Sequence, residues 1–256
     1  MIKEDIKFEN STVFEGMTSI RSILKARDLG FNDRVIEQIL FDSSKLNKIA
    51  KNLGYLRAVS NKYGFVLTES SGEKIEKITL GSSHGGLVAI AKERTIPCLS
   101  DSSEIRTDGF YCMIQGIEDP YNLGYSLRSL YACGCDGIIL PERNWMSAAG
   151  VVARSSAGAS EMLPMYKSDA LNCADIFHSL GYNIVCADER TDNILGKCEL
   201  KKPILLIVGG EKRGISKDLL NKTDMLVKIE YAREFHASLS AASATTMFAY
   251  EIMRQN

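Results

Sequence analysis

The sequence predicts an α/β protein in which a small N-terminal α/β unit precedes a larger unit built on a parallel sheet. Three observations support this prediction. Short apolar runs alternate with segments of helical periodicity, the runs in the second half are apolar throughout, and a polar segment separates the halves. Strands apolar on both faces are typical of parallel sheets covered by helices on each side. The 256 residues, 45% of them hydrophobic, suffice for two modest cores.

The N-terminal unit is predicted over residues 1–95. Apolar residues at helical spacing indicate one helix over 15–26 and a longer one over 43–64, which could break at Gly54. Strands are expected at 35–41, 65–69 and 86–92.

The polar segment from Glu93 to Gly109 contains Pro97 and has weak periodicity, so we place a linker at 96–108. It could include an ordered piece at Ile96–Leu99.

The second unit, 109–256, alternates strands and helices. Five strands are predicted, at 110–115, 137–140, 183–187, 203–210 and 225–230. Four helices are predicted, at 123–133, 168–180, 215–222 and 238–254.

Composition excludes several classes of protein. The formal net charge is −1, which argues against a strongly basic nucleic-acid-binding surface. No apolar stretch approaches the roughly 20 residues of a membrane span, and the first residues lack the apolar core of a signal peptide, so we expect a cytoplasmic protein without a membrane partner. The seven cysteines form no C-x-x-C pair and the three histidines are far apart, which indicates free thiols and no metal site.

The helix predicted at 123–133 carries one arginine off its apolar stripe. Asn122 precedes it as an expected N-cap, and Gly134 is a natural C-terminal stop. The stripe consists of three leucines: Leu123, Leu127 and Leu130. Arg128 lies outside that stripe, which by itself fits an ordinary surface arginine or a functional one.

Two later loops could bind a ligand. The sequence "LLIVGGEKRGIS" is a buried strand followed by a turn with Gly209, Gly210 and Gly214, and ligands of open α/β sheets bind beyond such strand ends. It is neither a P-loop nor a G-x-G-x-x-G motif. The second loop, "IEYAREFHASLSAASA", precedes a helix rich in small residues, for which Ser238 is the expected N-cap.

These blocks, in this order, resemble the signature motifs of the SpoU (TrmH-type) branch of the SPOUT RNA methyltransferases, and the resemblance covers essentially the whole chain. "NLGYSLR" is similar to the first motif, "IVGGEKRGIS" to the second and "IEYAREFHASLSAASA" to the third. "SSAGASEMLP" matches a further family segment, while "FEGMTSIRSILK" and "SSHGGLVAI" resemble the small RNA-recognition domain that often precedes the catalytic one.

The resemblance implies an S-adenosylmethionine-dependent 2′-O-ribose methyltransferase that acts on rRNA or tRNA as a homodimer. It also implies a catalytic domain with a C-terminal trefoil knot, an element that periodicity alone does not indicate. Arg128 then corresponds to the catalytic arginine, supported by three further catalytic residues: Asn122, Glu211 and Ser238. Three residues would line the cofactor pocket: Gly209, Ile229 and Leu239. In the N-terminal unit Tyr55 or Tyr63 could contact RNA, although their apolar context favours the core.

The third motif departs from the family pattern. Glu230 and Tyr231 replace Pro and Met, Ser240 replaces Asn, and the loop is about one residue longer. One alternative is therefore an RNA-binding member of the same fold with lost or altered methyl transfer. Another is an unrelated nucleotide-binding α/β enzyme that uses "GGEKRG" as a phosphate loop, which the acidic Glu211 disfavours.

Overall fold

A computed structural model of the protein describes residues 13–81, 84–100, 104–141, 148–209 and 215–256, and the chain divides into two compact units. The first unit contains the residues up to Thr95 together with 144–162, and the second contains the remainder. None of the helices in these ranges is both long and apolar enough to cross a membrane. All seven cysteines are free thiols.

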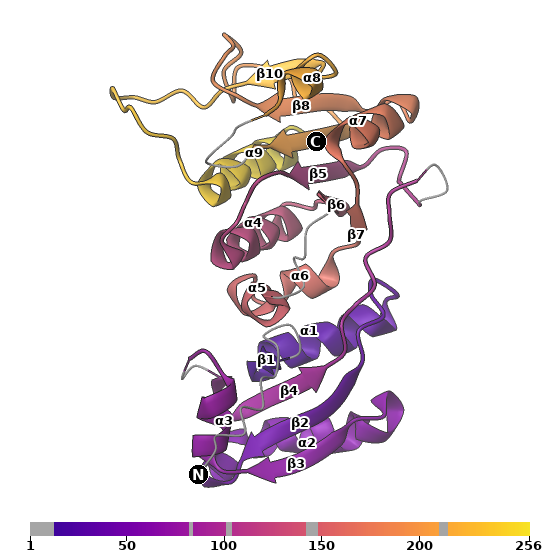
Figure 1. Ribbon diagram of the computed structural model, residues 1–256, viewed down its shortest axis with the longest axis vertical. Helices are drawn as coiled ribbons and strands as arrows, with labels where there is room; N and C mark the ends of the chain where they lie inside the picture. The colour runs from indigo at the N-terminus through magenta and orange to yellow at the C-terminus, as the bar shows by residue number, and fades with distance from the viewer. Residues whose placement is uncertain (1–12, 82–83, 101–103, 142–147, 210–214) are drawn as a thin grey trace, which may run out of the picture. The chain divides into compact units, whose positions relative to one another are not determined.

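The first unit is built on a four-stranded sheet of order β1-β4-β2-β3 (Figure 1). Its strands are β1 (Val13–Glu15), β2 (Ile36–Asp42), β3 (Val66–Ser70) and β4 (Leu87–Ala91). β4 pairs antiparallel with β1 and β2, while β2 and β3 are parallel. The predicted strands over 35–41, 65–69 and 86–92 are confirmed.

Helices cover both faces of this sheet. α1 (Gly16–Asp28) and α2 (Leu46–Tyr63, after the short 3-10 turn η1, Ser43–Lys45) bury their apolar stripes in one core with Leu87 and Ala89 of β4. The alternate residue Val88 belongs to a second cluster with Ile75 of α3 (Gly72–Ile78), on the other face. α2 continues through Gly54 without a break, because the buried Leu53 and Leu56 on either side hold it against the core.

The first unit is completed by two helices that come from much later in the chain. α5 (Ala149–Ser155) and α6 (Ala159–Met162) contact β1 and α1. Gly158, between them, approaches α1 so closely that a Cβ atom would lie 1.8 Å from Ser22 Oγ. The fully buried Arg34 guanidinium donates to Glu161 Oε2 at 2.9 Å, and Arg154 Nη1 donates to Glu15 Oε2 at 2.8 Å.

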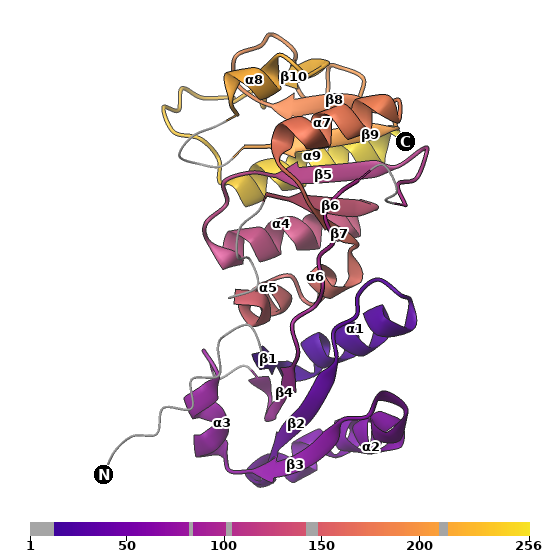
Figure 2. The same cartoon turned by 45° about the vertical axis from the view of Figure 1, so that its right-hand side comes forward.

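The second unit is a six-stranded parallel sheet of order β10-β8-β9-β5-β6-β7 (Figures 1 and 2). Its strands are β5 (Phe110–Ile114), β6 (Gly137–Leu140), β7 (Met165–Lys167), β8 (Asn183–Ala187), β9 (Ile204–Val208) and β10 (Met225–Val227). The predicted parallel sheet is confirmed, with β7 as the strand that the sequence did not reveal. The predicted linker contains an ordered piece, because Leu99 N donates to Lys167 O at the end of β7.

Two pairs of helices accompany this sheet. α7 (Ala170–Ser179) and α8 (Lys217–Leu220) pack through Phe177 and Leu219 onto Leu205 and Ile207 of β9. α4 (Pro120–Ala132) and α9 (Ala241–Gln255) pack against each other, and α9 contacts β9. Alternate strand residues such as Leu206 are equally buried, as expected for a sheet covered on both faces.

Candidate active site

α4 carries the first motif, and its N-cap is Asp119. The Asp119 carboxylate accepts hydrogen bonds from the backbone N–H groups of Tyr121 and Asn122, and Pro120 occupies the first helical turn. The prediction of Asn122 as the N-cap is therefore wrong: Asn122 lies inside the first turn. Asp is an equally good cap, and Pro120 is preorganised for the first helical position, so the helix begins earlier than the apolar stripe suggested.

Arg128 is exposed on α4, as its position outside the leucine stripe predicts. The three leucines of that stripe are buried, and Gly134 follows the helix with φ of +78°. Within the described part of the chain, Arg128 forms no hydrogen bond or ion pair. Its guanidinium is thus available to a ligand.

A cavity of about 670 Å³ lies beyond the carboxyl ends of β8, β9 and β10. Four residues predicted from the sequence line it together: Gly209, Ile229, Ser238 and Leu239. Asn122 and Arg128 are not among its lining residues, and Glu211 lies outside the described residues. The second and third motifs therefore share one cavity, as their expected places at strand ends imply.

Two side chains of the loop before α9 accept hydrogen bonds from the backbone of the loop and of the helix start. Ser240, not Ser238, is the N-cap of α9, because its Oγ accepts from Ser243 N at 3.2 Å. The two serines are two residues apart and chemically identical, so the sequence could not distinguish them. The hydroxyl of Tyr231 accepts from Leu239 N at 3.2 Å and thereby bridges the two ends of the loop.

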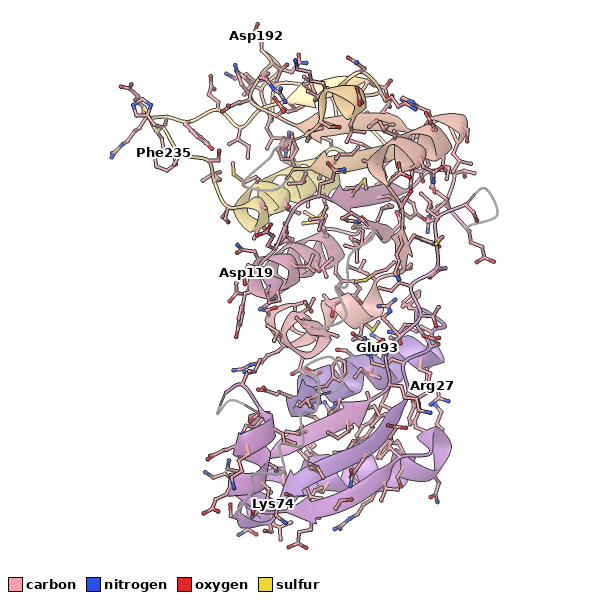
Figure 3. The ribbon with its side chains drawn as sticks, in the orientation of Figure 1. Arg27, Lys74, Glu93, Asp119, Asp192 and Phe235 are labelled. Atoms are coloured by element: carbon pink, nitrogen blue, oxygen red, sulfur yellow. The ribbon has the colours of Figure 1, made fainter. Side chains whose placement is uncertain are left out.

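Tyr231 and Phe235 add an aromatic wall to the cavity. Their ring centroids are 5.8 Å apart in an edge-to-face arrangement, and both residues line the cavity. Figure 3 labels Phe235 on the loop between β10 and α9 and Asp119 at the start of α4. Tyr231, which stands where the family pattern has Met, thus stabilises the loop through its hydroxyl and its ring contact with Phe235.

The first-motif helix is attached to the cavity through α9. Ala241, Ala244 and Phe248 of α9 line the cavity, and α9 packs along α4. Arg128 therefore lies on the helix that supports one cavity wall.

Sequence reasoning missed a charged pair in the cavity wall. Asp188 follows β8 directly, and its carboxylate binds Arg190 through Nε at 2.8 Å and Nη2 at 2.7 Å. Hydrogen bonds from Arg190 hold the pKa of Asp188 below its usual range. The signal that could have revealed it is an acidic residue immediately after a buried strand, in "NIVCADER".

Sequence comparison finds related proteins. The sequence model described as the SpoU rRNA Methylase family matches residues 109–250. The 23S rRNA (guanosine-2′-O-)-methyltransferase RlmB of Shewanella oneidensis is 28% identical over 261 aligned positions, which cover 100% of this chain and 99% of that protein.

Solved structures that share the fold include two with bound AdoMet. The AdoMet-bound rRNA methyltransferase from Sinorhizobium meliloti has a TM-score of 0.78 at 22% identity, covering 95% of this chain and 87% of that one. The SpoU methyltransferase AviRb from Streptomyces viridochromogenes, in complex with AdoMet, has a TM-score of 0.75 at 23% identity, covering 95% and 89%.

Proposed function

The chain belongs to the SpoU rRNA methylase family, and from this premise we propose that it is an S-adenosylmethionine-dependent RNA 2′-O-ribose methyltransferase. The observation that carries the proposal is that residues of the second and third motifs line one and the same cavity at the strand ends. The relative from Shewanella oneidensis, similar over its full length, suggests rRNA, and a guanosine of 23S rRNA, as the first substrate to test.

The chemistry of the cavity suits an adenosine-based cofactor. Val208, Ile229 and Leu239 offer apolar surface to a base, while Asp188 offers a buried carboxylate to polar groups. S-adenosylmethionine would supply an electrophilic methyl group on its sulfonium. Gly209 has no side chain, so the end of β9 admits a ligand close to its backbone. The implied trefoil knot remains a prediction of the family resemblance.

Arg128 is the residue we assign to the reaction itself. A ribose hydroxyl is a poor nucleophile, so its developing negative charge must be stabilised as it attacks. The exposed guanidinium of Arg128 can donate to that oxygen or grip an adjacent phosphate with two N–H groups. A guanidinium stays charged, so the proton passes to water or to an RNA phosphate. Asn122, Glu211 and Ser238 keep the supporting roles that the resemblance implies.

The first unit is the proposed reader of RNA. All four charged residues of α2 are basic and exposed: Lys48, Lys51, Arg57 and Lys62. The prediction of a core position is wrong for Tyr55, which is exposed on the same helix with the Arg21 guanidinium 5.2 Å from its ring centroid, whereas Tyr63 packs on the core as predicted. An exposed aromatic beside cations is suited to stack on unpaired bases. Replacing Lys48 and Lys51 by Glu should weaken RNA binding and flatten its salt dependence.

A homodimer is the proposed assembly, and α4 with α9 is its proposed face. Tyr121 and Tyr125 of α4 and Met247 and Tyr250 of α9 are all more than 40% exposed on two helices that pack together. Contiguous apolar side chains on a surface mark interaction sites. Sedimentation equilibrium should report a dimer that Tyr250→Glu converts to monomer. A cytoplasmic location also remains a proposal.

The decisive experiment is methyl transfer to RNA that lacks this modification. Total RNA from a strain without this gene is incubated with the purified protein and radiolabelled S-adenosylmethionine, and 2′-O-methyl positions are mapped by their resistance to alkaline cleavage. One newly protected rRNA or tRNA position is expected. RNA binding without any cofactor binding would instead favour the alternative of a non-catalytic member, which the changed third motif motivates.

A further inference from the structure

Asp188 lies at the edge of the sheet between two predicted cofactor residues. β8 and β9 are parallel with Ala187 opposite Val208, so Asp188 and Gly209 leave neighbouring strands at the same level. On the other side, Asp188 N donates to Val227 O at 3.1 Å, two residues before Ile229. All three of Asp188, Gly209 and Ile229 line the cavity.

Arg190 fixes the orientation of this carboxylate. Its Nε and backbone N–H both donate to Oδ1, at 2.8 and 2.9 Å, and its Nη2 donates to Oδ2 at 2.7 Å. The Asp188 side chain is only 8% exposed, whereas that of Arg190 is 54% exposed. A carboxylate offers about four acceptor sites. The three bonds from Arg190 therefore leave acceptor capacity on Oδ2.

The pairing selects the kind of ligand group that this carboxylate can bind. Because Arg190 already balances the charge of Asp188, the pair offers little attraction to a cation such as a sulfonium or an ammonium. A neutral hydroxyl, which needs only an acceptor, fits better. In open parallel sheets, an acidic residue at the carboxyl end of a strand is a known acceptor for ribose hydroxyls.

We propose that Asp188 binds the ribose of the cofactor, accepting a hydrogen bond from a ribose hydroxyl, and that Arg190 is the positioning residue that holds the carboxylate in place. This inference rests on the proposed function. It adds a side-chain contact with the sugar to a cavity in which Gly209 can offer only its backbone.

Calorimetry with S-adenosylhomocysteine on the full-length protein tests the contact. Asp188→Asn should weaken binding by about 10- to 100-fold, the range expected for losing a charge-assisted hydrogen bond. The matched control is Asp108→Asn, because Asp108 also pairs with an arginine two residues away, Arg106, but is exposed and outside the cavity. That control should bind within twofold of the parent protein.

A pair of smaller ligands tests the contact with the ribose hydroxyls separately. 5′-Methylthioadenosine lacks the amino-acid part of the cofactor, and its 2′,3′-dideoxy analogue also lacks the hydroxyls. Asp188→Asn should lose affinity for the first by the same factor as for S-adenosylhomocysteine and retain affinity for the second, which also shows that it is folded. Arg190→Gln should lower the ratio of the affinity for 5′-methylthioadenosine to the affinity for its 2′,3′-dideoxy analogue. A merely structural role would not produce this effect.

Four outcomes would overturn the inference. Equal losses for both members of the ligand pair would indicate general damage to the cavity. A loss for S-adenosylhomocysteine alone would assign Asp188 to the amino-acid part. Unchanged binding of every ligand by Asp188→Asn would remove its role while leaving the proposed function intact, whereas a parent protein that binds none of these ligands would overturn both.

Discussion

The hydroxyl of Ser129 on α4 lies 2.7 Å from the hydroxyl of Thr246 on α9. Thr246 Oγ1 also donates to Ala242 O at 2.8 Å, so Ser129 is the donor between the two hydroxyls. The helix that carries Arg128 is thereby attached to the helix that walls the cavity. This arrangement gives a structural reason why a first motif distant in sequence could act together with the later loops.

Arg128→Ala should reduce kcat by at least about 10²- to 10³-fold, the loss expected when one donor to a developing oxyanion is removed. Affinity for S-adenosylhomocysteine should stay within twofold, because Arg128 does not line the cavity. Methyl-transfer kinetics and calorimetry measure the two effects. Arg106→Ala, another exposed arginine of the second unit, is the control. Parent-level turnover by Arg128→Ala would contradict the assignment.

Asp119→Ala and Ser240→Ala should each lower the free energy of unfolding by about 1 kcal/mol, because each removes a helix N-cap. Asn122 and Ser238 are the residues that sequence alone suggested as caps. Asn122→Ala and Ser238→Ala should lower the free energy of unfolding by less than the first two variants and should lower turnover by more. Urea denaturation and turnover, measured on all four variants, separate capping from function. The reverse ranking would show that the caps are misassigned.

Glu161→Ala should destabilise the first unit by about 3–5 kcal/mol, since it leaves the fully buried Arg34 guanidinium without its carboxylate partner. The control is Glu37→Ala, which breaks the exposed pair of Glu37 with Lys92 and should change stability by less than about 1 kcal/mol. Urea denaturation measures both. Equal effects would mean that burial does not determine how much the Arg34–Glu161 pair contributes to the free energy of unfolding.

Glu251 should make stability depend on acid pH. Hydrogen bonds from Arg254 and Gln255 lower the pKa of Glu251 to about 2. A carboxyl group whose folded pKa is depressed stabilises the fold above its unfolded pKa, and that contribution is lost as pH falls toward 2. Glu251→Gln should therefore cost about 1–2 kcal/mol at pH 7 and progressively less below pH 4.5. A pH-independent difference in urea denaturation would contradict this.

The parts of the structure that the sequence predicted are those with a local signal. β5, β6, β8 and β9 are short apolar runs, and each lies where its run placed it. Helix starts were harder, because Asp119 and Asn122, or Ser238 and Ser240, are equally good caps and only the backbone path chooses between them.

Long-range partners had no local signal at all. Glu161 pairs with Arg34 across 127 positions, so nothing near "SSAGASEMLP" indicates that this segment completes the first unit. In the candidate site, the two loops were predicted because each follows a buried strand, whereas Gly209 and Ile229 were assigned to the cofactor pocket by the family resemblance. The Asp188–Arg190 pair was not, because an aspartate two residues from an arginine is common on any exposed turn.

The two-part composition of the first unit has a consequence for its synthesis. Glu15 and Arg34 meet Arg154 and Glu161 only after β5, α4 and β6 have been translated. At about 5–20 residues per second, the 67 residues between Thr95 and Met162 take a ribosome roughly 3–13 s to add. A nascent chain that stops at Thr95 thus leaves Glu15 and Arg34 without their partners and a face of α1 uncovered, so a product that ends before Met162 lacks a finished N-terminal unit.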